Sequence, residues 1–272
     1  MIDGTVGEGG HAQLILEKTG PDGKMLGIDW DETQIENSKN NLAEFGGRAA
    51  VVEGSYKDIK EIATAAQFEE VQGILLDVGY SSWQIEGLRK GFSFSKDEAL
   101  DMRYSMKNPL TVAEIINQWP EKELEKIIEE YGEEKFARQI AKKIAETRED
   151  KKIETTFELK EIIGQAIPGK FQHGGIHYAT RTFQALRIAV NGELDNLEQA
   201  LPKALDMLEP GGRLVVISFH SLEDRIVKNF FRDKAQQGSA TILTKKPIEA
   251  TEEETSQNPR SRSAKLRAII KK

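Results

Sequence analysis

Cysteine is absent from this chain of 272 residues. Disulfides, a thiolate nucleophile and thiolate metal ligands are therefore excluded. Histidine is scarce, with four residues, and no clustered spacing of His, Asp and Glu indicates a metal site. No stretch approaches the roughly 18 apolar residues of a membrane span, and the start lacks the basic-then-apolar pattern of a secretory signal. We therefore predict a globular protein of the cytoplasm that holds no metal.

An excess of positive charge is also lacking, because the formal net charge is −7. Phosphate contacts need a local excess of Lys and Arg, so any RNA-binding surface must be a patch. There are two candidate patches, and an ordinary solvated surface is the alternative for each. One is the stretch 256–272, which contains no acid. The other is a helical face made of Lys135, Arg138, Lys142 and Lys143.

Short apolar runs alternate with helical periodicity in the first part of the chain, which predicts an α/β fold with a mostly parallel sheet. The predicted strands are Met25–Asp29, 49–52, 73–77 and 213–218. Asp31 is predicted to cap a helix that Gly46 and Gly47 end. Two more strands are expected at 241–243 and 265–270, and we predict a loop in the polar segment 245–263 between them.

The chain between Asp77 and Gly212 is much longer than one crossover helix needs. Helical spacing is clear in it, and capping boxes begin two of the helices, at Thr111 with Glu114 and at Thr155 with Glu158. We therefore predict a discontinuous sheet domain, residues 1–99 and 177–272, interrupted by a helical insert at 100–176.

A glycine-rich run, from Asp3 to His11, stands near the start, with glycines at positions 4, 7, 9 and 10. Such a turn after a strand lets the backbone approach a ligand closely. Asp29 ends the next strand, where a carboxylate can bind both ribose hydroxyls. The turn has no Lys or Arg for a pyrophosphate, so S-adenosylmethionine, a sulfonium attached to adenosine, fits better. Asp77 and Tyr56 also stand at the ends of predicted strands and could contribute to this site. The alternative for Asp77 is that it caps a helix, and the alternative for Tyr56 is that it packs beneath the sheet.

Several runs along the chain resemble one family closely: bacterial methyltransferases, MraW-like, that act on the exocyclic N4 of a cytosine in the decoding region of 16S ribosomal RNA. They are Gly7-Glu8-Gly9-Gly10-His11, Gly73-Ile74-Leu75-Leu76-Asp77, Gly91-Phe92-Ser93-Phe94, Leu100-Asp101-Met102-Arg103, Ala179-Thr180-Arg181-Thr182-Phe183-Gln184-Ala185-Leu186-Arg187, Ser218-Phe219-His220-Ser221-Leu222-Glu223-Asp224-Arg225 and Asn258-Pro259-Arg260-Ser261-Arg262-Ser263.

The resemblance implies a class I, Rossmann-like methyltransferase sheet and a helical insert that recognises the substrate. It also implies that S-adenosylmethionine is held by Gly9, Gly10, His11, Asp29, Tyr56, Asp77 and Gln84. The family's Val-Ser-Ser-Pro-Gln is here Tyr80-Ser81-Ser82-Trp83-Gln84, so the two aromatic residues inherit no role. Family members usually carry a further segment before the first strand, whereas this sequence starts almost at the glycine-rich turn.

Candidate catalytic residues are Ser81 and Ser82, which could accept hydrogen bonds from a cytosine amine, and His220, which could orient the base. A structural hydrogen bond is the alternative for His220. Ser221 and Asp224 have the spacing of a helix cap and its partner. Bases could stack on Tyr80, Trp83, Phe92 and Phe94, or these rings could be core. His177 with Arg181 could face the RNA backbone or simply begin a helix.

The expected partner is 16S ribosomal RNA or the small ribosomal subunit, with no membrane. The sequence leaves the oligomeric state open between a monomer and a homodimer. Two other functions remain: a small-molecule methyltransferase, and a ribosome-binding or assembly module whose shortened N-terminus has lost catalysis. The helical insert and the basic 256–272 stretch favour RNA over a small molecule.

Overall fold

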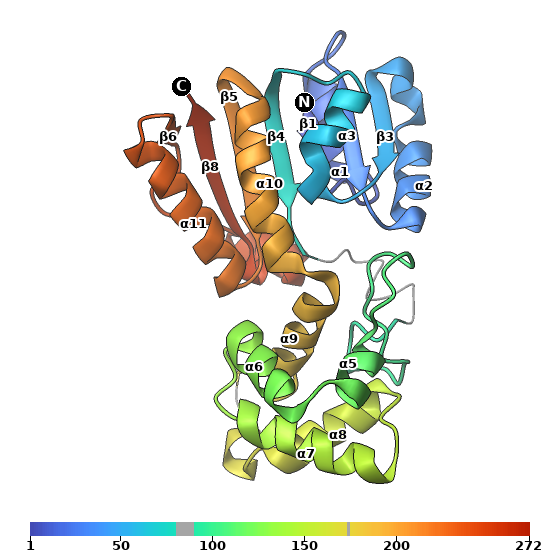
Figure 1. Cartoon of the computed structure of the whole chain (residues 1–272). Helices are drawn as coiled ribbons and strands as arrows, with labels where there is room; N and C mark the ends of the chain where they lie inside the picture. Colours follow the sequence, from blue (N-terminus) through green and yellow to red (C-terminus); the bar gives the residue numbers. More distant parts are fainter. Residues whose placement is uncertain (80–89, 173–174) are drawn as a thin grey trace. The chain divides into compact units, whose positions relative to one another are not determined.

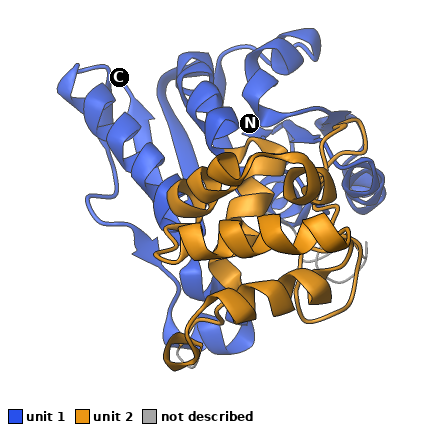
Figure 2. Cartoon of the chain, turned by 60° about the horizontal axis from the view of Figure 1, so that its bottom comes forward, with its two compact units in different colours: residues 1–79, 194–272 blue, residues 80–193 orange. Residues whose placement is uncertain are grey.

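The computed structural model describes residues 1–79, 90–172 and 175–272. The chain forms two compact units, which Figure 2 colours separately: unit 1 is residues 1–79 with 194–272, and unit 2 is residues 80–193. Unit 2 is wider than the predicted insert at both ends. At one end, Thr156 Oγ1 donates to the carbonyl of Lys96 at 2.6 Å and ties the segment before residue 100 to a helix of unit 2.

Unit 1 contains the sheet and the helices that cover it (Figure 1). Its elements are β1 (Ile2–Asp3), α1 (Gly10–Lys18), β2 (Met25–Asp29), α2 (Glu32–Asn41), η1 (Ala43–Arg48), β3 (Ala49–Glu53), η2 (Tyr56–Asp58), α3 (Ile59–Ala65), β4 (Val71–Asp77), α10 (Glu193–Met207, whose first residue is counted in unit 2), β5 (Leu208–Ser218), α11 (Ser221–Gln236), β6 (Ala240–Ile242), β7 (Ile248–Glu249), α12 (Glu252–Gln257), η4 (Pro259–Ser263) and β8 (Lys265–Lys271).

The strand order in the described part of the chain is β3-β2-β1-β4-β5-β8-β6, and β7 also pairs with β8. The strands from β3 across to β5 pair in parallel, whereas β8 is antiparallel to β5. This sheet confirms the predicted α/β class. The chain first builds outward from β1 to β3 and then returns to the other side of β1, so the strand order reverses between β1 and β4. Open α/β sheets bind ligands at such a point.

Apolar side chains alternate between the two faces of β2, because successive residues of a strand point to opposite sides. Leu26 and Ile28 join the core beneath α3, α10 and α11, which lie in front of the sheet in Figure 1. Met25 joins a second core with Ala12 and Leu16 of α1 on the other face. Both faces are covered, as a mostly parallel sheet requires.

The predicted strands and the cap at Asp31 are confirmed, with Asp31 Oδ1 accepting from the amide of Thr33 at 3.0 Å. The prediction of a loop throughout 245–263 is wrong. That segment contains β7, α12 and η4. Thr251 caps the helix α12, and Ile248–Glu249 pair with the edge of β8. None of the helices in the described residues is long and apolar enough to span a bilayer.

Unit 2 is helical around its own apolar core. Both predicted capping boxes are present, at Thr111–Glu114 and Thr155–Glu158. Phe92 stacks on Tyr104, and Phe94 stacks on His177, so these aromatic rings pack within the unit. The elements are α5 (Val112–Gln118), α6 (Glu121–Gly132), α7 (Ala137–Asp150), α8 (Thr156–Ala166), η3 (Gly169–Phe171) and α9 (Thr180–Asn191).

Candidate functional site

Three acidic residues meet at the carboxyl ends of β1, β2 and β4. Asp3 pairs in register with Gly27 of β2 and with Leu75 of β4. Asp29 and Asp77 lie two residues beyond those partners, so all three side chains leave the sheet on the same face. That face is the one covered by α1, and the edge is where the strand order reverses.

The glycine-rich turn is fastened to the strands on both sides of β1. The amide of Gly4 donates to the carbonyl of Leu75, and the amide of Val6 donates to the carbonyl of Ile28, each at 2.9 Å. Asp29 Oδ2 accepts from the amide of Gly7 at 3.0 Å, and its Oδ1 accepts from the amide of Asp31 at 3.0 Å. Asp29 therefore fixes the turn through backbone hydrogen bonds from Gly7, Asp31 and Trp30, and a carboxylate with about four acceptor sites can still accept from a ligand donor.

Gly9 and Gly10 begin α1 at the end of this turn. Gly9 is the N-cap and has φ 93°, a left-handed conformation that glycine adopts without strain. A Cβ on Gly10 would meet no atom within 4 Å among the described residues. The helix start is therefore open above Gly10, and its unpaired amides are suited to bind a ligand's polar atoms.

Asp77 is connected to the turn through Thr5 and His11. The amide of Asp77 donates to Thr5 Oγ1 at 2.7 Å, and His11 Nε2 lies 3.3 Å from Asp77 Oδ2. The hydrogen bond with Asp77 raises the pKa of His11. Asp77 Oδ1 is buried and has no hydrogen-bond partner in the part of the chain that the structure describes. A buried acceptor of this kind is costly unless a ligand donor satisfies it.

Asp3 is a site residue that the sequence argument did not single out. It is fully buried, and it accepts from the amide of Thr5 at 3.1 Å. Burial, together with smaller contributions from the charges of Asp77 and Asp29, raises the pKa of Asp3 to about 7. The available signal was an acid at the end of a strand, the pattern that Asp29 and Asp77 share.

We expect Asp3 to make stability depend on pH. The folded protein keeps this proton up to about pH 7, whereas an unfolded Asp loses it near its ordinary pKa of 3.8. The contribution of Asp3 to the free energy of unfolding is therefore fully present at low pH. It decreases as the pH rises toward 7, by at most about 1.4 kcal/mol per pH unit. Asp3→Asn should become more stable relative to the wild type as the pH rises, measured by urea denaturation.

The control for this experiment is Asp22→Asn, which changes an exposed carboxyl in the turn before β2. Its stability relative to the wild type should not follow the same pH course. A difference between Asp3→Asn and the wild type that stays constant from about pH 4 to pH 8 would contradict the assignment.

Burial also raises the pKa of Asp29, to about 6. The charges of Asp77 and Asp29 also disfavour the ionisation of Asp3 between them, as like charges do. A ligand with positive charge and several hydroxyl donors would relieve this repulsion. The arrangement fits the predicted S-adenosylmethionine, whose sulfonium and ammonium are cations and whose ribose carries two hydroxyls.

The other predicted site residues divide into two groups. Tyr56 is buried in the core beneath the sheet with Ile59, which is the packing role that its alternative named. Its contact with a cofactor stays a prediction. The predicted residues Tyr80, Ser81, Ser82, Trp83 and Gln84 lie outside the described residues.

His220 is the N-cap of α11, so the cap lies one residue before the predicted Ser221. Its Nδ1 accepts from the amide of Glu223 at 3.5 Å, and Nε2 lies 3.1 Å from Glu223 Oε1. Asp224 instead forms an ion pair with Arg267, at 2.6 Å between Oδ1 and Nε. Spacing alone could not separate these registers, because either histidine or serine can accept the amide hydrogen. A catalytic role for His220 stays a prediction.

The two basic patches are partly used within the fold. In the 256–272 stretch, Arg267 is paired with Asp224, and Lys271 donates to the carbonyls of Asp206 and Leu208. In the helical patch, Lys142 lies 3.7 Å from Glu146. His177 stacks between Phe94 and Tyr178, with ring centroids 4.5 and 4.2 Å away, so its faces are covered.

Comparison with known proteins gives consistent matches. The model of the MraW methylase family matches residues 1–272. The ribosomal RNA small subunit methyltransferase H of Syntrophotalea carbinolica is 46% identical, over 99% of this chain and 90% of the relative. The protein of the same name from Kosmotoga olearia is 49% identical, over 98% and 89%. A crystal structure of an rRNA methylase from Streptococcus thermophilus is similar with a TM-score of 0.45 at 10% identity, covering 99% of this chain and 84% of that one.

The family match covers the whole chain, and the relatives share nearly half of its residues. The family predicted from the sequence motifs is confirmed, and with it S-adenosylmethionine as the cofactor. This chain, with its glycine-rich turn and its acidic edge at the strand reversal, belongs to the MraW methylase family.

Proposed function

We propose that this chain transfers a methyl group from S-adenosylmethionine to the exocyclic N4 of a cytosine in the decoding region of 16S ribosomal RNA. The family and the names of the relatives support the small-subunit RNA as substrate. The observation that carries the proposal is Asp77 Oδ1, which is buried and has no hydrogen-bond partner among the described residues, at the same edge of the sheet as Asp29. The cytoplasmic location predicted from the sequence follows from that substrate.

Each described residue of the edge has a proposed task toward the cofactor. Asp29 accepts the ribose hydroxyls with the acceptor capacity that its backbone hydrogen bonds leave over. Gly9 and Gly10 allow close approach of the methionine part, because no atom of the described residues lies within 4 Å of a Cβ placed on Gly10. Asp77, held by Thr5 and His11, accepts a donor of the ligand at Oδ1. When bound, the cofactor supplies an electrophilic methyl group on a sulfonium.

The acceptor amine needs positioning more than it needs a strong base. The lone pair of a cytosine amine is delocalised into the ring, so the nitrogen must be held in line with the methyl–sulfur bond. Hydrogen-bond acceptors beside the amine restore lone-pair density and stabilise the positive charge that develops on nitrogen. Ser81 and Ser82 are our candidates because they follow β4 and Asp77 directly in the chain.

The test is transfer of a labelled methyl group. We expect the full chain, given methyl-labelled S-adenosylmethionine and small subunits that lack the modification, to label one cytosine of 16S RNA at N4. Digestion to nucleosides and mass spectrometry identify the position, and fully modified subunits are the control. Label on another atom or nucleotide would contradict the cytosine-N4 assignment. Absence of cofactor binding in calorimetry, together with absence of transfer, would favour a ribosome-binding or assembly module.

A further inference from the structure

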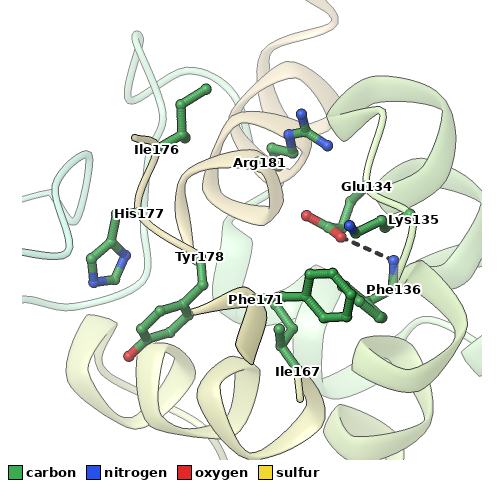
Figure 3. Close-up of a pocket in the computed structure, with 9 residues that line it drawn as sticks. All are labelled: Glu134, Lys135, Phe136, Ile167, Phe171, Ile176, His177, Tyr178 and Arg181. Carbon is green, nitrogen blue, oxygen red and sulfur yellow. Dashed lines mark hydrogen bonds between the residues drawn. The ribbon is translucent and has the colours of Figure 1, made fainter. Parts of the chain in front are cut away.

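A hollow of about 170 Å³ lies within unit 2 (Figure 3). Its lining comes from the turn between α6 and α7, the end of α8, η3 and the start of α9. The residues involved are far apart in the sequence, from Glu134 to Arg181. Only the packing of these helices brings them together.

An exposed aromatic ring forms one wall of this hollow. Phe171 is 44% exposed, and it contacts Phe136 with ring centroids 5.2 Å apart. Figure 3 shows Ile167 beside the two rings. A half-exposed ring that lines a hollow offers an apolar, planar surface to a ligand.

Cations gather around the same ring. Lys135 Nζ lies 4.0 Å from the centroid of Phe171, and Lys170 Nζ lies 5.0 Å from it. Arg181 lines the hollow and uses one guanidinium donor on the carbonyl of Glu133, at 3.0 Å. An arginine has five such donors, so others remain for a ligand.

Glu134, the acidic residue that lines the hollow, already accepts a hydrogen bond from within the protein. Glu134 is 6% exposed, and its Oε1 accepts from the amide of Phe136 at 2.9 Å, drawn as a dashed line in Figure 3. It thereby holds the chain where α7 begins. Lys135, Lys170 and Arg181 are exposed around the hollow and outnumber the one exposed acid beside them among the described residues, Glu133.

We propose that this hollow binds one unstacked nucleotide of single-stranded RNA, with its base against Phe171 and its phosphates beside Lys135 and Arg181. The inference rests on the proposed function, which supplies an RNA substrate. An exposed ring and a rim of cations match the two parts of a nucleotide, because bases stack on aromatic faces and phosphates bind Lys and Arg. An acidic peptide would satisfy the cations and leave the ring without a planar partner.

The chain offers a matched control for the ring. Phe157, at the start of α8, is also 44% exposed and also has a lysine over its ring, Lys160 at 5.5 Å, but it does not line the hollow. Phe171→Ala in the full chain should weaken binding of a fluorescent, short single-stranded RNA by roughly tenfold to a hundredfold, the effect of removing one stacking partner. Phe157→Ala should bind like the wild type, and Phe171→Trp should keep most of the affinity.

The cations are tested by the dependence of affinity on salt. Lys135→Gln and Arg181→Gln should each reduce the slope of log affinity against log salt by about 0.7, the release expected per phosphate contact of a single strand. Lys122→Gln, at the exposed start of α6, should leave the slope unchanged.

Several results would overturn the proposal: equal RNA affinities for Phe171→Ala and Phe157→Ala, loss of affinity in Phe171→Trp as large as in Phe171→Ala, or displacement of the RNA by an acidic peptide at equal concentration. Thermal melting separates misfolding from lost contact, and the tryptophan variant decides the case if the alanine variant melts early. Methyl transfer by the wild type is scored separately. If the wild type fails to methylate RNA while Phe171→Ala still weakens RNA binding, only the proposed reaction is wrong.

Discussion

Asp29→Ala is expected to weaken the binding of S-adenosylmethionine by about a hundredfold or more. The substitution removes the acceptor proposed for two ribose hydroxyls, and hydrogen bonds to a charged group contribute about 1.5–3 kcal/mol each. It also releases the amide of Gly7, which Asp29 Oδ2 holds at 3.0 Å, so the turn keeps the bond from Val6 to Ile28 but loses this second hydrogen bond to β2. Isothermal titration calorimetry with the full chain measures the dissociation constant.

Two further variants are measured for comparison with Asp29→Ala. Glu36→Ala removes an exposed acid from α2, the helix that follows Asp29, and should leave the dissociation constant unchanged. Asp29→Asn keeps one acceptor oxygen and should lie between the wild type and Asp29→Ala. Equal affinities for the wild type and Asp29→Ala would remove Asp29 from the cofactor site.

Protonation gives the same site a pH dependence. The pKa of Asp29 is raised to about 6 by burial, so its carboxylate loses its charge as the pH falls below that value. A neutral carboxyl accepts hydrogen bonds more weakly. The affinity of the wild type should therefore decrease below about pH 6, and Asp29→Asn should lose most of that decrease.

Glu193→Gln is expected to lower the free energy of unfolding by about 3–5 kcal/mol, the cost of breaking a buried ion pair. The Arg187 guanidinium binds Glu193 through two hydrogen bonds of 2.8 Å, and the Tyr104 hydroxyl donates to Glu193 at 2.8 Å. Arg187 and Glu193 are 8% and 5% exposed. Removing one charge leaves the buried guanidinium without its counter-ion. Urea denaturation followed by circular dichroism measures the loss.

Glu146→Gln is the matched control, because Glu146 pairs with Lys142 at 3.7 Å on the surface of the same unit. An exposed pair contributes at most about 1 kcal/mol. The double variant Arg187→Met with Glu193→Gln should recover part of the stability, since no uncompensated charge then stays buried. A loss below about 1 kcal/mol in Glu193→Gln would show that the pair is not a major source of stability.

Local patterns were enough for several elements of both units, although not for β7, α12 and η4. Thr111 and Thr155 begin helices as predicted, because a capping box is completed by residues three apart and needs nothing from elsewhere in the chain. The strand Met25–Asp29 was predicted with its observed bounds because an apolar run buried on both faces has few other conformations available. The cap of α11 was placed one residue late, since His220 and Ser221 both carry an acceptor.

By itself, the sequence determined the fold class, the family and the glycine-rich turn with Asp29, because these depend on residues close together in the chain or on whole motifs. Only the tertiary structure decided that Asp3, Asp29 and Asp77 leave the sheet on one face, since this follows from the register of three strands. It also decided the burial that raises the pKa of Asp3 and the meeting of Phe171 with Lys135, which are separated by more than thirty residues. Charge, burial and stacking act across space, and a linear sequence does not record which distant side chains become neighbours.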